Sequence, residues 1–217
     1  KPEKSADFIN HVMSTLRMIL TEGAARYNLP QVFTNIKTLR VGQTEVNPFT
    51  LQQMHKLIEA VRVDFKNYYI VRFLTGLRTG EIDGLQWKYV DFDRRQILVR
   101  EAITNGKLGP LKTPSSRREV DMSTPVYEAL LEQYEQTGKT CLFVFCTRAN
   151  TPLDHRNVRD RIWAPLLKQL ERPYRRPYET RHTTATLWLG AGENPEWIAR
   201  QLGHANTKML FTVYSRY

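Results

Sequence analysis

Three short motifs carry side chains that could act on a phosphate group. The first covers residues 75–81, with the sequence TGLRTGE. A glycine lets the backbone bend and approach a ligand closely, and the planar guanidinium of Arg78 offers a fork of donors that suits phosphate oxygens. Glu81 could hold or orient that fork. On its own, the motif also fits a glycine-punctuated helix junction with a surface arginine, so it gains weight only beside the other two.

The second motif covers residues 178–183, with the sequence YETRHT. Tyr178 and Arg181 are three positions apart, so on a helix they share a face. Arg181 could close the other side of a phosphate clamp, although a solvent-facing arginine is the simpler alternative. His182 lies one residue off that face, and we expect it to be hydrogen-bonded within the fold.

The third motif joins Gly203 and His204 to Tyr214, near the end of the sequence. It places an imidazole beside a phenol that could act as a nucleophile. The alternative is a helix stop followed by an ordinary amphipathic tyrosine.

The composition favours a nucleic-acid partner. Lysine and arginine total 32 against 22 acidic residues, and a formal charge of +10 would concentrate the protein around a polyanion, without separating DNA from RNA. No apolar run approaches the roughly 20 residues that span a bilayer, and no segment resembles a signal peptide. We therefore expect an intracellular protein without a membrane partner. Cys141 and Cys146 lack a zinc-site pattern and are expected to be reduced core residues.

The apolar spacing predicts the helices that would position these motifs. Apolar residues recur at helical spacing over residues 8–29 and are followed by Pro30 and a polar, basic stretch. A second helix is expected to start after Pro48, where Thr50 and Gln53 form a capping-box pattern. Further helices are expected from Thr124-Pro125, from Asn194-Pro195 to a stop at Gly203, and over residues 158–170 and 178–189.

Strands are a small minority in this prediction. Residues 96–100 and 118–122 have strand character, and Asn105-Gly106 is a turn signal. We expect a mainly α fold with one small antiparallel β-sheet (α+β), divided into residues 1–46 and residues 47–217. Other basic residues are expected to contact phosphates or to solvate the surface: Lys37, Arg40, Arg117, Arg118, Arg156, Arg159, Arg161, Arg172, Arg175 and Arg176.

In this order, the three motifs resemble those of the tyrosine recombinases, the phage integrase family, and the resemblance covers residues 48–217. It maps the two family arginines onto Arg78 and Arg181, the family histidine onto His204 and the nucleophile onto Tyr214. Glu81 and His182 are expected to support these residues without contacting the phosphate themselves. The competing tyrosine, Tyr217, is less well placed. The resemblance also implies that residues 1–46 are the end of a helical core-binding domain plus a linker, with most of that domain outside this sequence.

The family also carries a lysine on a hairpin between the two arginine motifs. Residues 110–120, PLKTPSSRREV, resemble that segment and indicate Lys112, with Lys107 as the competitor. One departure is Tyr178, which stands where the family usually has histidine or lysine. A phenol can donate a hydrogen bond to phosphate but is a poor base near neutral pH. Two expectations stay open: Tyr178 binds rather than transfers a proton, or His182 or water compensates for it.

The resemblance implies a site-specific DNA recombinase or integrase. Tyr214 would attack a DNA phosphodiester, expel a 5′ hydroxyl and leave a 3′-phosphotyrosyl bond, with neither a metal nor a nucleotide cofactor. Arg78, Arg181 and His204 would stabilise the negative charge of the transition state. Lys112 would protonate the leaving oxygen.

The resemblance also implies the partners: double-stranded recombination sites, a homo-tetramer on DNA and accessory DNA-bending proteins, in the cytoplasm of a bacterium or a phage-infected host. Two alternatives remain open. A type IB topoisomerase would use the same chemistry, although the core-binding segment and the LGH spacing favour a recombinase. A DNA-binding module with lapsed chemistry is suggested by Tyr178.

Overall fold

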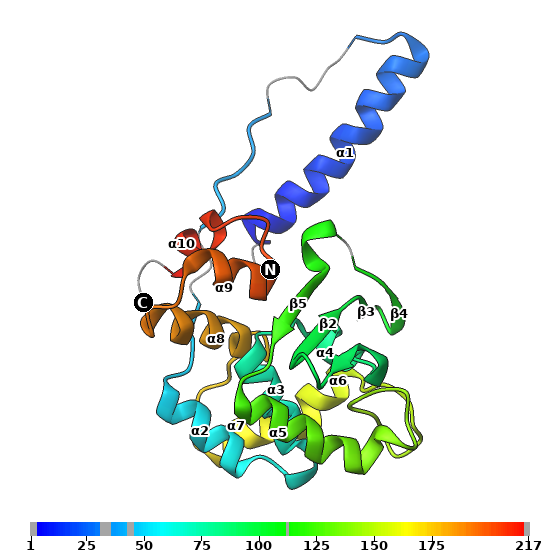
Figure 1. Ribbon diagram of the computed structural model, residues 1–217. Coiled ribbons are helices and arrows are strands. Elements are labelled where there is room, and N and C mark those ends of the chain that lie inside the picture. Colours follow the sequence, from blue (N-terminus) through cyan, green and yellow to red (C-terminus); the bar gives the residue numbers. More distant parts are fainter. Residues whose placement is uncertain (1–3, 31–35, 43–45, 112, 215–217) are drawn as a thin grey trace. The chain divides into compact units, whose positions relative to one another are not determined.

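The computed structural model describes residues 4–30, 36–42, 46–111 and 113–214 (Figure 1). The chain divides into two compact units, Lys1–Glu45 and Val46–Tyr217. No helix in the described ranges is long and apolar enough to cross a membrane.

The first unit is built on one long helix, α1 (Ala6–Tyr27). Ser5 caps its start by accepting a backbone hydrogen bond, and Asn28 ends it in the left-handed conformation. Asn10 ties the segment 36–42 to this helix, because its side chain donates to and accepts from the backbone of Leu39, each at 2.8 Å. The helix expected from the apolar spacing over residues 8–29 is confirmed, but none of its residues is buried.

The second unit packs its helices around a main aromatic-rich core and a smaller apolar cluster. Its helices are α2 (Leu51–Ala60), α3 (Lys66–Thr75), α4 (Thr79–Asp83), α5 (Thr124–Gln133), α6 (His155–Val158), α7 (Ala164–Gln169), α8 (Glu179–Gly190), α9 (Pro195–Leu202) and α10 (Lys208–Tyr214). Short 3-10 turns cover Val63–Phe65, Trp87–Tyr89 and Pro114–Ser116, and π-helical turns cover Tyr134–Gly138 and Arg159–Trp163. The expected mainly helical fold is confirmed.

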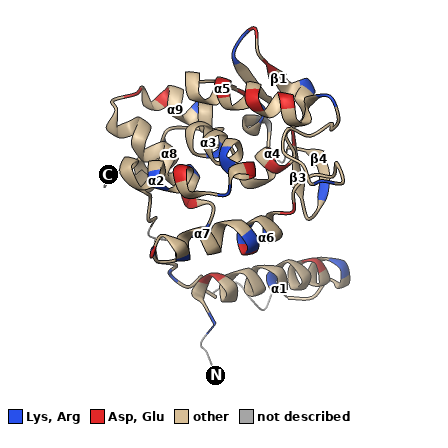
Figure 2. Cartoon of the chain, turned by 90° about the horizontal axis from the view of Figure 1, so that it is seen from below, with Lys and Arg blue, Asp and Glu red and all other residues tan. Residues whose placement is uncertain are grey.

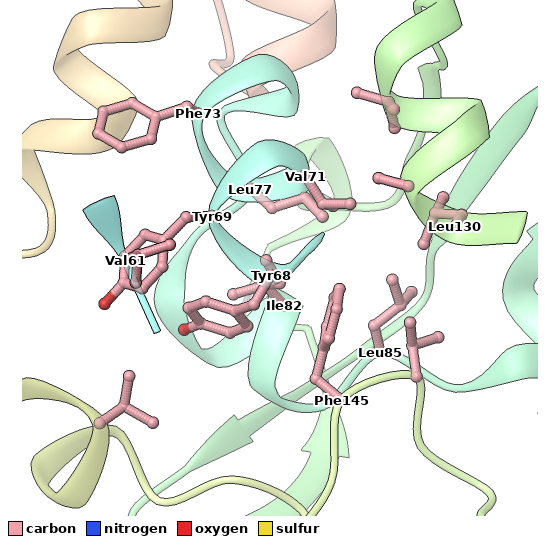
Figure 3. Packing of buried hydrophobic residues seen from close by; sticks show 14 of the residues in the cluster. Val61, Tyr68, Tyr69, Val71, Phe73, Leu77, Ile82, Leu85, Leu130 and Phe145 are labelled. Atoms are coloured by element: carbon pink, nitrogen blue, oxygen red, sulfur yellow. The ribbon is translucent and has the colours of Figure 1, made fainter. Parts of the chain in front are cut away.

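Helix α3 runs through the middle of that core. Figure 3 shows Tyr68, Tyr69 and Phe73 projecting from it among other buried apolar side chains. Tyr69 stacks on Trp163 with ring centroids 5.3 Å apart, and such aromatic pairs add stability beyond the area they bury. Since α3 also packs against α8, the core fixes the helix that carries Arg181.

The helix starts follow the expected sequence signals, with one shift. Thr50 and Gln53 form a complete capping box at α2, and Asn194 accepts two backbone hydrogen bonds at the start of α9. At α5 the cap position is Ser123, one residue before the expected Thr124, and no side-chain capping bond is made. Pro125 suits either the first or the second position of the helix. It therefore does not determine whether Ser123 or Thr124 is the cap.

The strands form two sheets where one was expected. β1 (Val90–Asp91), β2 (Gln96–Val99) and β5 (Arg118–Asp121) make an antiparallel sheet in the order β1-β2-β5. β3 (Glu101–Thr104) and β4 (Lys107–Pro110) form a separate hairpin. Its turn residues Asn105 and Gly106 have φ of 52° and 75°, as the turn signal indicated.

The hairpin is separate because β3 packs on α4. Gly80 permits this approach, since a Cβ at that position would lie 2.2 Å from the Ile103 carbonyl oxygen. Between β2 and β3, Arg100 turns back and donates to the carbonyl oxygens of Val99 and Arg118. The chain thus leaves the three-stranded sheet before the hairpin begins.

Basic and acidic positions are interspersed along the helices of both units (Figure 2). Arg156, Arg161, Arg172 and Arg176 are exposed, as expected. Arg175 differs, because its guanidinium lies 4.4 Å from the centre of the Phe49 ring and donates to the Pro48 carbonyl. This arginine therefore supports the core.

Candidate active site

The first motif lies at the junction of α3 and α4. Gly76 ends α3 with a left-handed φ of 62°, and the chain then turns so that Arg78 immediately precedes α4. Glu81 holds Arg78 in two ways: it accepts from the backbone N–H at 2.8 Å and from Nη1 at 2.8 Å. The remaining Nη2 donates to the Gly203 carbonyl at 3.0 Å. This is the orienting contact expected of Glu81, and it joins the first motif to the third.

A second arginine, Arg118, binds the Glu81 carboxylate. Arg118 on β5 donates Nη2 and Nη1 to the two Glu81 oxygens at 2.8 and 3.0 Å, and both side chains are only 3% exposed. Burial raises the pKa of the Glu81 carboxyl, but hydrogen bonds and charge from Arg118 and Arg78 outweigh it and lower the pKa to about 2. Arg118 also donates Nε to the Gln201 carbonyl at 2.6 Å. The expectation that Arg118 lies at the surface is wrong.

The second motif supplies the central cation. Arg181 on α8 is 1% exposed and donates Nη1 to the Gly76 carbonyl at 2.6 Å and Nη2 to the Leu202 carbonyl at 2.5 Å. Burial lowers the pKa of Arg181 to about 10, so the guanidinium stays charged near neutral pH. Because Gly76 belongs to the first motif and Leu202 directly precedes Gly203 of the third, Arg181 links all three.

His204 follows directly on the end of α9, where Gly203 adopts a left-handed φ of 66°. Its Nε2 lies 3.0 Å from Arg181 Nη2. Since a guanidinium only donates, this contact assigns the acceptor role to Nε2 and the proton to Nδ1. Nδ1 is buried and has no hydrogen-bond partner among the described residues. Burial and the neighbouring cations, Arg181 first, lower the pKa of His204 to about 4, so the ring is neutral near pH 7.

Tyr214 ends α10 within a small apolar cluster formed with α8 and α9. Only 3% of the residue is exposed, and burial raises the pKa of its hydroxyl, against the opposing effect of the Arg181 charge. The hydroxyl lies 2.7 Å from Nδ1 of His182. His182 is hydrogen-bonded within the fold, as expected, and its partner is the predicted nucleophile.

Tyr178 occupies the cap position of α8 and is 41% exposed. Tyr178 and Arg181 differ in burial, since Tyr178 lies at the surface and Arg181 is 1% exposed. The Tyr178 and His182 rings make an edge-to-face contact, with centroids 5.1 Å apart.

The predicted lysine, Lys112, lies outside the described residues, as does the competing tyrosine, Tyr217. The competing lysine, Lys107, is the first residue of β4 and is exposed.

One buried cation near the site was not singled out from the sequence. Arg72 on α3 is 2% exposed and donates to Thr79 Oγ1 at 2.7 Å, Thr180 Oγ1 at 3.0 Å and the Pro177 carbonyl at 3.1 Å. It therefore fixes the start of α4 relative to the start of α8. The available signal was a charged residue within the otherwise apolar stretch YYIVRFL.

The fold and the converging motifs define a protein class. Residues 47–217 match the phage integrase family, and the chain belongs to that family.

The relatives and solved structures are consistent with this assignment. The chain is 28% identical to the Escherichia coli (strain K12) protein named "Putative defective protein IntQ", over 100% of this chain and 62% of that protein. It is 30% identical to "Prophage integrase IntR" of the same organism, over 84% of this chain and 50% of that protein. The chain thus spans between half and 62% of the lengths of these two relatives.

The Tn1549 transposon integrase, solved in complex with a circular intermediate DNA, has a TM-score of 0.82 at 20% identity, covering 97% of this chain and 75% of that one. A lambda integrase dimer bound to a core site has a TM-score of 0.72 at 16% identity, covering 96% and 73%. At these identities, the two structures show a shared fold.

Proposed function

We propose that this chain is the catalytic part of a site-specific DNA recombinase that cuts and rejoins DNA through a 3′-phosphotyrosyl bond. The observation that supports the proposal most is the convergence of Arg78, Arg181 and His204 from three separate motifs. Helix α10 packs against the helix that carries Arg181, and this brings Tyr214 to the same place.

The arrangement suits a phosphate diester. The Arg78 side chain is 32% exposed, whereas Arg181 is buried. Arg78 therefore carries the guanidinium that an incoming phosphate meets first. The buried Nδ1–H of His204 has no acceptor among the residues that the structure describes, which is costly until an acceptor such as a phosphoryl oxygen arrives. Fixed donors aimed at developing negative charge are the largest catalytic contribution that such a site can make.

The reaction has two coupled bond changes. The Tyr214 oxygen forms a bond to phosphorus while the bond from phosphorus to the 5′ oxygen breaks, leaving the 3′ phosphate on the tyrosine. In this proposal Lys112 gives a proton to the departing 5′ oxygen, and Tyr178 donates a hydrogen bond to the phosphate from the rim. Glu81 positions Arg78. Attack by a 5′ hydroxyl on the phosphotyrosyl bond reverses the steps and rejoins a strand.

The partners follow from the same proposal. They are double-stranded recombination sites, a homo-tetramer on DNA and accessory DNA-bending proteins, in the cytoplasm of a bacterium or a phage-infected host. Residues 1–46 would be the end of a core-binding domain with its linker, and residues 47–217 the catalytic domain. The structural division at Val46 and the DNA-bound state of the solved relatives support these assignments.

A module with lapsed chemistry is the second candidate, favoured by Tyr178 at the position of the usual histidine or lysine and by the word "defective" in the name of one relative. Against it, Arg78, Arg181, His204 and Tyr214 are all present and close together.

A trapping experiment tests the proposal. The chain is incubated with a pool of nicked duplexes of randomised sequence, in which the cleaved fragment diffuses away and prevents rejoining. We expect a denaturation-resistant protein-DNA adduct with the wild type and with Tyr174→Phe, which alters an exposed phenol, and none with Tyr214→Phe. An adduct that persists in Tyr214→Phe would move the nucleophile elsewhere, and its absence from the wild type would favour the lapsed module.

A further inference from the structure

The predicted nucleophile, Tyr214, is in direct contact with a second histidine of the site, His182. Nδ1 of His182 lies 2.7 Å from the Tyr214 hydroxyl, and the two rings are tilted by 56° with centroids 5.6 Å apart. His182 follows Arg181 on α8, so its backbone position is fixed by the same core contacts. The nucleophilic oxygen of the proposed reaction therefore has an imidazole nitrogen as its direct partner.

The nucleophile must lose a proton when it attacks. Burial, reinforced by the Arg181 charge, lowers the pKa of His182 to about 4, so its ring is neutral near pH 7 and one ring nitrogen can accept a proton. The phenol is a donor under the same conditions, because burial raises its pKa. A hydrogen bond from the Tyr214 hydroxyl to Nδ1 is thus the arrangement that these protonation states favour.

The neighbouring groups are worse placed for this proton. Nε2 of His204 already accepts from Arg181. Tyr178 meets the edge of the His182 ring and lies at the surface. Arg181 carries no acceptor.

We infer that His182 is a catalytic residue, which takes the proton of the Tyr214 hydroxyl as its oxygen attacks the phosphate. This inference rests on the proposed function. The Tyr214 O–H bond breaks and an Nδ1–H bond forms while the oxygen bonds to phosphorus and the 5′ oxygen leaves. In the rejoining direction, the imidazolium returns the proton to the tyrosine.

The test is the rate of adduct formation in a single turnover on a nicked duplex that the wild type cleaves. Removing a general base typically slows a reaction by about 10²-fold to 10⁴-fold. We expect His182→Ala to lose at least roughly 10²-fold and imidazole in the buffer to restore part of that rate. His182→Gln, which keeps a hydrogen-bonding side chain but cannot take up a proton, should be as slow as His182→Ala. His55→Ala, at an exposed position on α2, is the matched control.

A second substrate separates the two ends of the reaction. In it, sulfur replaces the 5′ leaving oxygen, and a thiolate leaves without being protonated. His182→Ala should stay slow on this substrate, because its defect lies at the nucleophile.

Three results would overturn the inference: a His182→Ala rate within about threefold of the wild type, wild-type speed in His182→Gln, or full recovery of His182→Ala on the sulfur substrate. A wild type that forms no adduct at all would instead refute the proposed function. The two failures are therefore distinguishable.

Discussion

At the scale of single residues, Glu81 and Glu119 make a natural comparison. Glu81 pairs with Arg118 where both side chains are 3% exposed, whereas Glu119, on the same strand as Arg118, pairs with Arg100 at the surface. Removing one partner of a buried pair leaves an uncompensated charge, whereas exposed pairs contribute little.

We therefore expect Glu81→Gln to lower the free energy of unfolding by about 3–5 kcal/mol. Glu119→Gln should change it by no more than about 1 kcal/mol. Urea denaturation of both variants and the wild type measures the difference. Similar small effects at the two positions would mean that the buried pair does not hold Arg78 and β5 together.

The two histidines of the site predict a pH dependence. His182 and His204 have pKa values lowered to about 4 in the folded chain, against about 6.5 for an unperturbed histidine. Between these values the unfolded chain binds protons that the folded chain does not, so stability is lost as the pH falls from about 6.5 towards 4. Asp83, whose pKa is raised by burial to about 6, acts in the opposite sense.

The expected result is a melting temperature that falls more steeply over this range in the wild type than in the double variant His182→Gln, His204→Gln. Differential scanning calorimetry at a series of pH values gives both slopes. His55→Gln, at an exposed position, should leave the slope unchanged. Equal slopes in the wild type and the double variant would show that the two rings titrate normally.

At the scale of elements, the backbone at the end of α9 is held by contacts with two arginines. Gly203 has a left-handed φ of 66°, its carbonyl accepts from Arg78, and a Cβ there would lie 3.0 Å from Nη1 of Arg118. Gly190, at the end of α8, has no atom within 4 Å of such a Cβ.

Gly203→Ala should therefore destabilise the chain by at least about 1–2 kcal/mol, the usual cost of a side chain in the left-handed region. It should also slow adduct formation, because Arg78 and His204 both depend on this turn. Gly190→Ala should not lower stability, since alanine favours a helix. Chemical denaturation and the trapping assay, run on the same preparations, compare the two. A neutral Gly203→Ala would contradict the role given to the turn.

Helix starts could be predicted because their signals are local: Thr50 and Gln53 are three residues apart, as are capping partners in general. The burial of Arg118 could not, because its partners Glu81 and Gln201 come from distant parts of the chain. The separate hairpin escaped prediction for the same reason, since β3 is held by α4.

The candidate site shows the same division. The motif order indicated Arg78, Arg181 and His204, and they converge. No local pattern indicated that His182 rather than Tyr178 touches Tyr214, because that depends on where α10 packs.

At the scale of the whole molecule, the charge of +10 predicts how binding responds to salt. If the chain neutralises DNA phosphates, the logarithm of the affinity should fall linearly with the logarithm of the salt concentration, by about 0.9 for each phosphate neutralised. Fluorescence anisotropy of a labelled duplex at several salt concentrations measures the slope. An affinity that is insensitive to salt would exclude the phosphate-backbone binding assumed here.

The identity of the amino acid that carries DNA tests the proposed chemistry. The trapped adduct is digested with protease and nuclease, and the remaining nucleotide-peptide conjugate is sequenced by mass spectrometry. The proposed function predicts one conjugate, a nucleotide joined through its 3′ phosphate to Tyr214. A conjugate on any other residue, or one joined through a 5′ phosphate, would contradict it.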